Sequence, residues 1–189
     1  MKSILISIRP QWCEKIVNRQ KTIEVRKTAP KETPFKAYIY ETKAKNKWRF
    51  YDYEGAYENS KGEIVYAQQH VIGEFVCKDV ILLEFQKITS YDTYINLKKY
   101  LKEMCLSSRQ VFEYGCGKNL YGWHISDLKI YDKPKELSEF YTIAESGSDC
   151  CCGCVWHETP LEELPCRTCT GERKYLSRPP QSYMFVEEA

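Results

Sequence analysis

Three charged residues near the amino terminus are spaced so that they can act together. In the run Lys21-Thr22-Ile23-Glu24-Val25-Arg26, polar and apolar residues alternate as in a strand with one buried face. Glu24 and Arg26 then share the polar face, and Lys21 lies where the strand begins. Such an array suits two kinds of chemistry. It can bind a base edge or a phosphate as a fixed set of donors and acceptors, or Lys21 and Glu24 can exchange protons in a slow hydrolysis.

Two short elements must position this strand. Residues 3 to 9 alternate in the same way, so they predict a first strand whose open face carries Ser7 and Arg9. Pro10 suits the first position of a following helix, and Asn18 can end that helix in a left-handed conformation. The expected ligand-binding residues of this strand, helix and strand are Ser7, Arg9, Lys21, Glu24 and Arg26.

The run from Lys21 to Arg26 resembles the signature of the ASCH domain family, G-x-K-x-x-E-x-R on a PUA-like β-barrel. Further segments agree with the family in order, namely 71–77 (VIGEFVC), 121–128 (YGWHISDL) with Pro134 after it, and 179–186 (PPQSYMFV). The resemblance covers about the first 140 residues and the last dozen. Arg19 stands where the family has Gly, a change that costs little if Asn18 takes the left-handed position.

The resemblance implies an α+β fold, a PUA-like mixed β-barrel with short flanking helices. It also implies binding of RNA or of modified nucleotides. Some proteins similar in fold and motif hydrolyse RNA or remove an acyl group from modified cytidine, the latter with Lys, Thr and Glu. In this chain Glu24 stands at the position of that Thr, and the catalytic candidates of an enzyme would be Lys21 and Glu24.

The middle of the chain supplies further strands and two more candidate ligand contacts. Residues 35 to 42 alternate as a third strand, and 43 to 69 fit an elaborated hairpin in which Trp48 and other aromatic residues interleave with Lys and Arg. This mixture suits either a platform for single-stranded RNA or cross-strand aromatic pairs that stabilise the hairpin. His124 alternates with its neighbours and is expected either to face the same surface as Glu24 or to have a purely structural role.

Residues 71 to 131 carry four more predictions of secondary structure. The most apolar stretch, 71–85, predicts one long central strand with a bulge at Gly73. A helix is expected over 91–104 and a second, shorter helix over 107–114. Residues 123 to 131 return to strand.

Clustered cysteines near the carboxyl terminus have the spacing of zinc ligands. Two C-x2-C pairs are separated by eleven residues and consist of Cys151, Cys154, Cys166 and Cys169. Each pair sets two thiolates on one side of a cation that takes four ligands in a tetrahedron. Cys150, Cys152 and His157 leave the ligand set open, and an iron-sulfur cluster or a redox cysteine patch is the alternative to zinc. Four thiolates would make a closed structural zinc site, so no catalysis is assigned to it.

A segment of about 25 residues cannot build its own apolar core, so metal binding would supply its folding energy. We therefore expect three parts: a PUA-like barrel over 1–145, a metal-stapled insertion over 146–174, and a carboxyl-terminal strand over 175–189 that returns to the barrel. Three functions are consistent with this organisation: an RNA-binding or nucleotide-binding module, a hydrolase that uses the same cleft, and a protein adaptor that docks through the zinc knuckle.

Charge is distributed unevenly along the chain. The net charge is only +2, yet residues 1–50 hold 13 Lys and Arg against 4 Asp and Glu, and the remainder holds 15 against 22. The basic half contains the Lys21 to Arg26 run, which indicates a phosphate-bearing partner or simply solvated lysines. No stretch approaches the ~20 apolar residues of a membrane span. We therefore expect a cytoplasmic protein in which reduced cysteines are free to bind metal.

Overall fold

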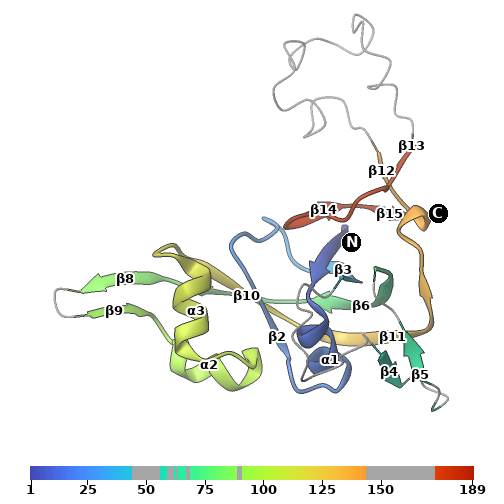
Figure 1. The fold of residues 1–189 in the computed structure, drawn as a ribbon. Coiled ribbons are helices and arrows are strands. Elements are labelled where there is room, and N and C mark those ends of the chain that lie inside the picture. Colours follow the sequence, from blue (N-terminus) through green and yellow to red (C-terminus); the bar gives the residue numbers. More distant parts are fainter. Residues whose placement is uncertain (44–55, 59–61, 63, 67–68, 89–90, 144–172) are drawn as a thin grey trace, which may run out of the picture.

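The structure, a computed structural model, describes residues 1–43, 56–58, 62, 64–66, 69–88, 91–143 and 173–189. Its centre is a five-stranded sheet in the order β11-β6-β3-β1-β14 (Figure 1). The strands are β1 (Ser3–Ile8), β3 (Phe35–Glu41), β6 (Val71–Cys77), β11 (Ser126–Lys135) and β14 (Tyr183–Phe185). The sheet is mixed, because β1 and β3 are parallel whereas the other neighbours are antiparallel.

Two three-stranded sheets and two hairpins complete the strands of the described residues. One sheet has the order β2-β10-β7, from Ile23–Arg26, Leu120–His124 and Val80–Leu83. The other has the order β13-β12-β15, from Arg173–Tyr175, Phe140–Ile143 and Glu187–Glu188. The hairpins pair β4 (Ala56–Glu58) with β5 (Ile64–Tyr66) and β8 (Phe85–Ile88) with β9 (Tyr91–Tyr94).

The helices of the described residues are short. They are α1 (Pro10–Val17), α2 (Leu97–Met104), α3 (Ser108–Gly115) and the single 3-10 turn η1 (Leu137–Glu139). Pro10 starts α1 as expected. A reciprocal pair of hydrogen bonds between Ser107 and Gln110 fixes the start of α3. Figure 1 shows α2, α3 and the β8–β9 hairpin at one end of the molecule and β12 and β13 at the other.

The main core lies between the five-stranded sheet and the β2-β10-β7 sheet. Phe35 from one sheet and Trp123 from the other meet edge to face, with ring centroids 5.1 Å apart, and both are buried. The chain crosses between the two sheets at Lys78–Asp79, which separates β6 from β7, and at Ile125, which separates β10 from β11. These two crossings let consecutive strands cover one shared core.

The outer face of each sheet is also covered. Tyr38 and Tyr40 on the five-stranded sheet pack with Phe140 and Val186 from the carboxyl-terminal region. On the β2-β10-β7 sheet, a second set of buried side chains packs beneath α2 and α3, and it includes Ile23, Val25, Leu83, Met104, Val111 and Leu120. Strand β2 is therefore buried on both of its faces.

The α+β class with a mixed sheet and short helices is confirmed. The prediction of a closed barrel is not confirmed, because the strands of the described residues form separate sheets rather than one ring. The expected long strand over 71–85 is wrong, since the apolar run serves two sheets and turns at Lys78–Asp79. The bulge lies beside Gly73, where Ile39 pairs with Gly73 but Tyr40 pairs with Val71.

Two further predictions need correction. The helix expected over 91–104 begins only at Leu97, because 91–94 pair with β8 as strand β9. Asn18 does not take the left-handed position, since its φ is −77°. Arg19 itself takes it, with φ of 56°, although it stands where the family has Gly.

Some predicted features lie outside the described residues. These are Trp48, the cysteines at 150, 151, 152, 154, 166 and 169, and His157. Within the hairpin expected over 43–69, β4 and β5 are antiparallel partners. No helix in the described part of the chain has the length and apolar content needed to cross a lipid bilayer.

Candidate functional site

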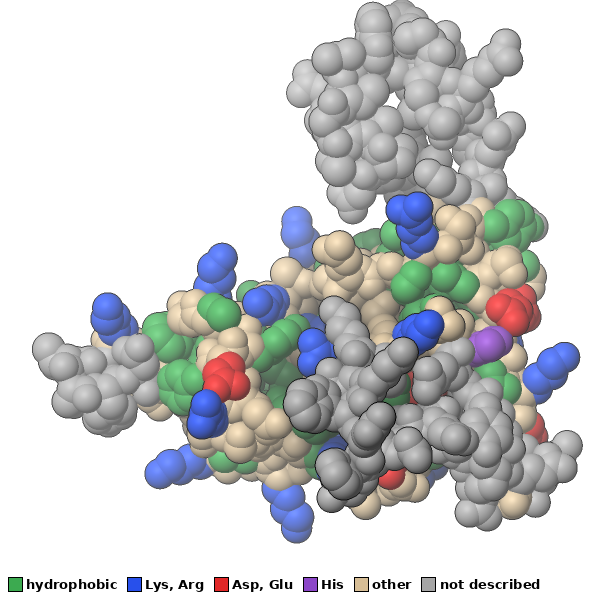
Figure 2. All heavy atoms as spheres, in the orientation of Figure 1, with side chains coloured by type: hydrophobic (Ala, Val, Ile, Leu, Met, Phe, Trp, Pro, Cys, Tyr) green, Lys and Arg blue, Asp and Glu red, His purple; other side chains and the backbone are tan. Residues whose placement is uncertain are grey.

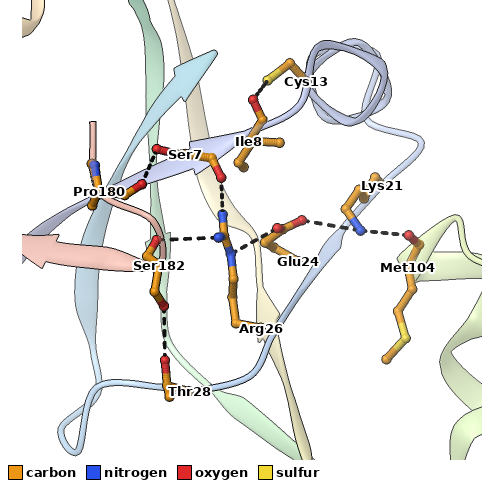
Figure 3. Close-up of polar contacts among 10 residues, drawn as sticks. All are labelled: Ser7, Ile8, Cys13, Lys21, Glu24, Arg26, Thr28, Met104, Pro180 and Ser182. Atoms are coloured by element: carbon orange, nitrogen blue, oxygen red, sulfur yellow. Dashed lines mark hydrogen bonds and ion pairs between the residues drawn. The ribbon is translucent and has the colours of Figure 1, made fainter. Parts of the chain in front are cut away.

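Lys21, Glu24 and Arg26 lie together, as the sequence predicted. The Lys21 Nζ is 3.4 Å from Glu24 Oε2, and the Arg26 Nε is 3.1 Å from Glu24 Oε1. Each carboxylate oxygen of Glu24 therefore has its own cation (Figure 3). We call these three residues the ion-paired cluster.

The ion-paired cluster is interior, whereas an open strand face was expected. Lys21 is 2% exposed, Glu24 7% and Arg26 6%. In the strand register Glu24 pairs with Trp123 and Arg26 with Tyr121, so Glu24 and Arg26 face the main core. Taking charges out of water costs several kcal/mol per ion, and pairing with further hydrogen bonds must offset that cost.

Lys21 has a complete set of partners. Its ammonium donates to the backbone oxygen of Met104 at 2.7 Å and lies 5.4 Å from the centre of the Trp12 ring, in addition to its contact with Glu24. Burial lowers the pKa of Lys21, and the neighbouring Glu24 opposes this shift. Helices α1 and α2 thus hold the lysine from two sides.

Arg26 links the cluster to both ends of the chain. Its guanidinium donates to the backbone oxygen of Ser7 at 2.7 Å and lies 3.4 Å from that of Ser182 (Figure 3). The Ser7 hydroxyl donates to the Pro180 oxygen at 2.6 Å. Ser7 therefore contacts the ion-paired cluster through its backbone oxygen, and its hydroxyl fastens the carboxyl-terminal segment.

A second carboxylate lies near this interior. Glu41, at the end of β3, is 1% exposed and faces the main core beside Ile8, its partner on β1. Burial raises the pKa of the Cys13 thiol, and Glu41 and then Glu24 raise it further. Cys13 therefore stays protonated and has the role of a small core residue.

His124 does not share a face with Glu24. It pairs with Ile23 in the register, and side chains of directly opposed residues project to the same side of a sheet. His124 is half-buried, and its Nε2 lies 3.9 Å from Asp79 Oδ2. The expectation that His124 and Glu24 line one surface is therefore wrong.

Exposed cations and one ring lie at the edge of the ion-paired cluster. Arg9 and Lys27, which flank α1 and β2, are exposed. The Tyr114 side chain of α3 is 39% exposed, and the Lys27 Nζ lies 5.1 Å from the centre of its ring. Burial raises the pKa of the Tyr114 hydroxyl and Glu24 raises it further, whereas Arg26, the backbone of Lys27 and Arg9 oppose the shift. We call Arg9, Lys27 and Tyr114 the basic edge.

The charge of this part of the molecule is positive. Four cations, Lys21, Arg26, Arg9 and Lys27, are only partly offset by the two carboxylates of Glu24 and Glu41. Figure 2 shows the same bias more widely, because more of the described charged side chains on its face are Lys or Arg than Asp or Glu. A positive region of this kind attracts anions.

Other candidate sites lie elsewhere. A hollow of about 490 Å³ is separate from the ion-paired cluster and is lined by residues of β9, α2 and α3 that include Asn96, Lys98 and Phe112. Within the described residues there is no group of three or more His, Cys, Asp or Glu side chains arranged to hold a metal ion.

Sequence reasoning missed Trp12, Tyr114 and the backbone oxygens of Met104 and Ser182 as neighbours of the cluster. The oxygens left no signal, because every residue type carries the same carbonyl. Trp12 fitted the apolar stripe of α1, and Tyr114 closed a helix assigned only by its periodicity.

No protein-family model and no curated protein matches the sequence. The fold does match solved structures. A crystal structure of ASCH from Zymomonas mobilis superposes with a TM-score of 0.53 at 16% identity, covering 98% of this chain and 88% of that one. A single-substitution mutant of the same protein gives a TM-score of 0.52 at 16% identity, covering 99% and 91%. The fold is therefore the ASCH fold that the Lys21 to Arg26 run implied.

Proposed function

From an ASCH fold with a buried Lys, Glu and Arg cluster, we propose that this protein is a binding module for RNA or a modified nucleotide. The carrying observation is that two exposed cations flank the buried cluster along the chain. Lys27 directly follows Arg26, and Arg9 stands two residues after Ser7, whose backbone oxygen accepts from the Arg26 guanidinium. Cations on a rigid support are suited to phosphates, because positioning costs little entropy once the support is fixed. The ion-paired cluster is that support.

The contacts of Lys21 favour binding over chemistry. Its ammonium already has the Met104 oxygen, Glu24 and the Trp12 ring as partners, and it is 2% exposed. A general base must lie within hydrogen-bond reach of the proton that it takes. Lys21 could reach a substrate only after giving up a buried ion pair. Ser7, Lys21, Glu24 and Arg26 would therefore shape the binding surface, with Arg9 and Lys27 in contact with the ligand.

The test is fluorescence anisotropy with a labelled pool of random 12-nucleotide single-stranded RNA at low salt. Wild-type protein should bind, and Arg9→Glu combined with Lys27→Glu should weaken binding by about ten-fold or more. The matched control is Lys87→Glu combined with Lys133→Glu, which makes the same charge change at exposed lysines away from the cluster. Equal losses in both double variants would show unspecific attraction and would overturn the proposal.

A hydrolase is the second candidate, and one observation favours it: burial lowers the pKa of Lys21. Lysines with lowered proton affinity occur at catalytic sites, although structural ion pairs perturb pKa values as well. Labelled RNA and acylated cytidine should be incubated with wild type, Lys21→Ala and Glu24→Ala. Turnover in the wild type that is absent from both variants, each shown by circular dichroism to be folded, would establish the hydrolase. Absence of turnover beside RNA binding would leave the binding module.

We also propose that a structural zinc ion staples residues 146–174, held by Cys151, Cys154, Cys166 and Cys169. The described flanks support an insertion, because β12 pairs with β13 up to Ile143 and Arg173, so the chain leaves and returns at neighbouring points. Four thiolates suit zinc, and a stapled knuckle would widen the RNA surface or dock a protein. Elemental analysis should find about one zinc per chain. The Cys166→Ser variant should lose the zinc ion. The Cys116→Ser variant, which changes an exposed thiol outside the four proposed ligands, should keep it.

A further inference from the structure

Tyr114 combines exposure with a fixed position. The end of α3 packs closely against β9, since a Cβ atom at Gly115 would come within 1.8 Å of the Tyr94 hydroxyl. That hydroxyl in turn donates to the Lys118 oxygen at 2.9 Å. Cys116, with φ of 50°, ends the helix directly afterwards. The backbone directly after Tyr114 is therefore held in place.

A cation lies beside the exposed Tyr114 ring. The Lys27 Nζ lies 5.1 Å from the centre of the ring, and Lys27 directly follows Arg26 of the ion-paired cluster in the chain. Aromatic rings beside cations bind single strands because a base stacks on the ring while the cations meet the phosphates. Such stacking tolerates any base, since every base has a flat π face.

We propose that Tyr114 is the stacking platform for an unpaired base of the bound RNA, an inference that rests on the proposed function. Lys27 orders the ring and meets a phosphate next to the stacked base. The ligand class is therefore single-stranded or flipped-out nucleotide, because a base inside a duplex has its faces covered by its neighbours.

The molecule offers a matched control in Phe185. This ring is 45% exposed, and the Nζ of Lys2 lies 5.9 Å from its centre, so the pair resembles Tyr114 with Lys27. Phe185 pairs with Ile4 at the other end of β1 from Arg9. It has the same ring and cation chemistry without the ion-paired cluster beside it.

The experiment compares Tyr114→Ala, Tyr114→Phe and Phe185→Ala in anisotropy titrations with two probes. The probes are the random 12-nucleotide RNA pool and inorganic polyphosphate, which has the charge but no base. Tyr114→Ala should weaken RNA binding at least about five-fold and leave polyphosphate binding unchanged. Tyr114→Phe, which keeps the ring, and Phe185→Ala should both bind RNA like the wild type.

Each contrary outcome has a defined meaning. RNA binding that survives Tyr114→Ala unchanged overturns the stacking platform and leaves the proposed function standing. Equal loss of RNA and polyphosphate binding, or loss in Tyr114→Phe as large as in Tyr114→Ala, also overturns stacking. A wild-type protein that does not bind the RNA pool at low salt overturns the proposed function itself.

Discussion

Glu24 and Glu74 lie on different sheets and each has two polar partners, but Glu24 is more deeply buried than Glu74. Glu24 lies in the interior between Lys21 and Arg26, and its side chain is 9% exposed. Glu74, on the outer face of the five-stranded sheet, accepts from the Tyr131 hydroxyl at 2.7 Å and from the Lys36 ammonium at 3.4 Å. The side chains of Glu74 and Lys36 are 18% and 29% exposed. Water therefore screens the second group and not the first.

The difference assigns different roles to the two groups. An exposed pair contributes little to stability, whereas loss of one partner from a buried pair leaves an uncompensated charge. The ion-paired cluster must therefore stay intact for β2, α1 and the carboxyl-terminal segment to pack together. A cluster under that constraint is suited to support a ligand surface and poorly suited to exchange partners during a reaction.

Glu24→Gln should have the largest effect on stability. The substitution keeps the shape of the side chain and leaves Lys21 and Arg26 buried without their shared carboxylate. We expect the free energy of unfolding at pH 7 to fall by about 3 kcal/mol. Urea denaturation followed by circular dichroism measures the change. A loss below 1 kcal/mol would mean that the cluster is less buried in solution, and the comparison with Glu74 would fail.

Glu74→Gln should cost less, about 1 kcal/mol at pH 7, because the site is partly screened. Burial alone would raise the pKa of Glu74, but the Tyr131 hydroxyl and the Lys36 ammonium together lower it below its usual range. A lowered folded-state pKa contributes stability that is full above the unfolded value of about 4.3 and disappears as pH falls through the folded value.

Unfolding of wild type and Glu74→Gln should therefore be compared at pH 7 and below pH 4. The difference between the two proteins should shrink at the lower pH, where Glu74 becomes protonated and resembles Gln. A difference that stays constant with pH would show that the carboxylate charge contributes nothing and that only shape matters there.

The smallest effect is expected at the turn that leads into Lys21. Arg19 has φ of 56°, a conformation that costs a residue with a Cβ atom roughly 1 kcal/mol and costs Gly little. Arg19→Gly should raise the free energy of unfolding by about 0.5 kcal/mol, since Gly also gains freedom in the unfolded chain. Arg19→Ala, which removes the charge but keeps the Cβ atom, is the control and should not stabilise. Equal stability of the two variants would show that the turn is unstrained.

The strand, helix and strand around Lys21 were readable because local patterns specify them. The alternation of apolar and polar residues predicted strands β1 and β2, and Pro10 predicted the start of helix α1. The spacing of the charged residues predicted that Lys21, Glu24 and Arg26 act together. The burial of that cluster was not readable. It depends on the Ser182 and Met104 oxygens, which come from segments distant in sequence and carry no residue-specific signal.

The errors along the rest of the chain have physical causes. The apolar run of β6 and β7 has the same sequence pattern whether it belongs to one sheet or to two. The pattern therefore could not predict that the chain passes from one sheet to the other at Lys78–Asp79. In the sequence, Tyr94 has the helical spacing of the apolar residues Leu97 and Met104. It packs in the same core as these two residues, but it belongs to strand β9 and not to α2. Periodicity identified the buried residues there but not the element that carries them.

The salt dependence of RNA binding tests the central claim most directly: the buried cluster supports exposed cations that bind phosphates. The slope of log affinity against log salt should be measured for wild type and for Arg9→Ala combined with Lys27→Ala, using the 12-nucleotide RNA pool. Each lost phosphate contact with a single strand should reduce the slope by about 0.7, so the double variant should lose about 1.4. An unchanged slope with unchanged affinity would place the binding surface elsewhere and contradict the account.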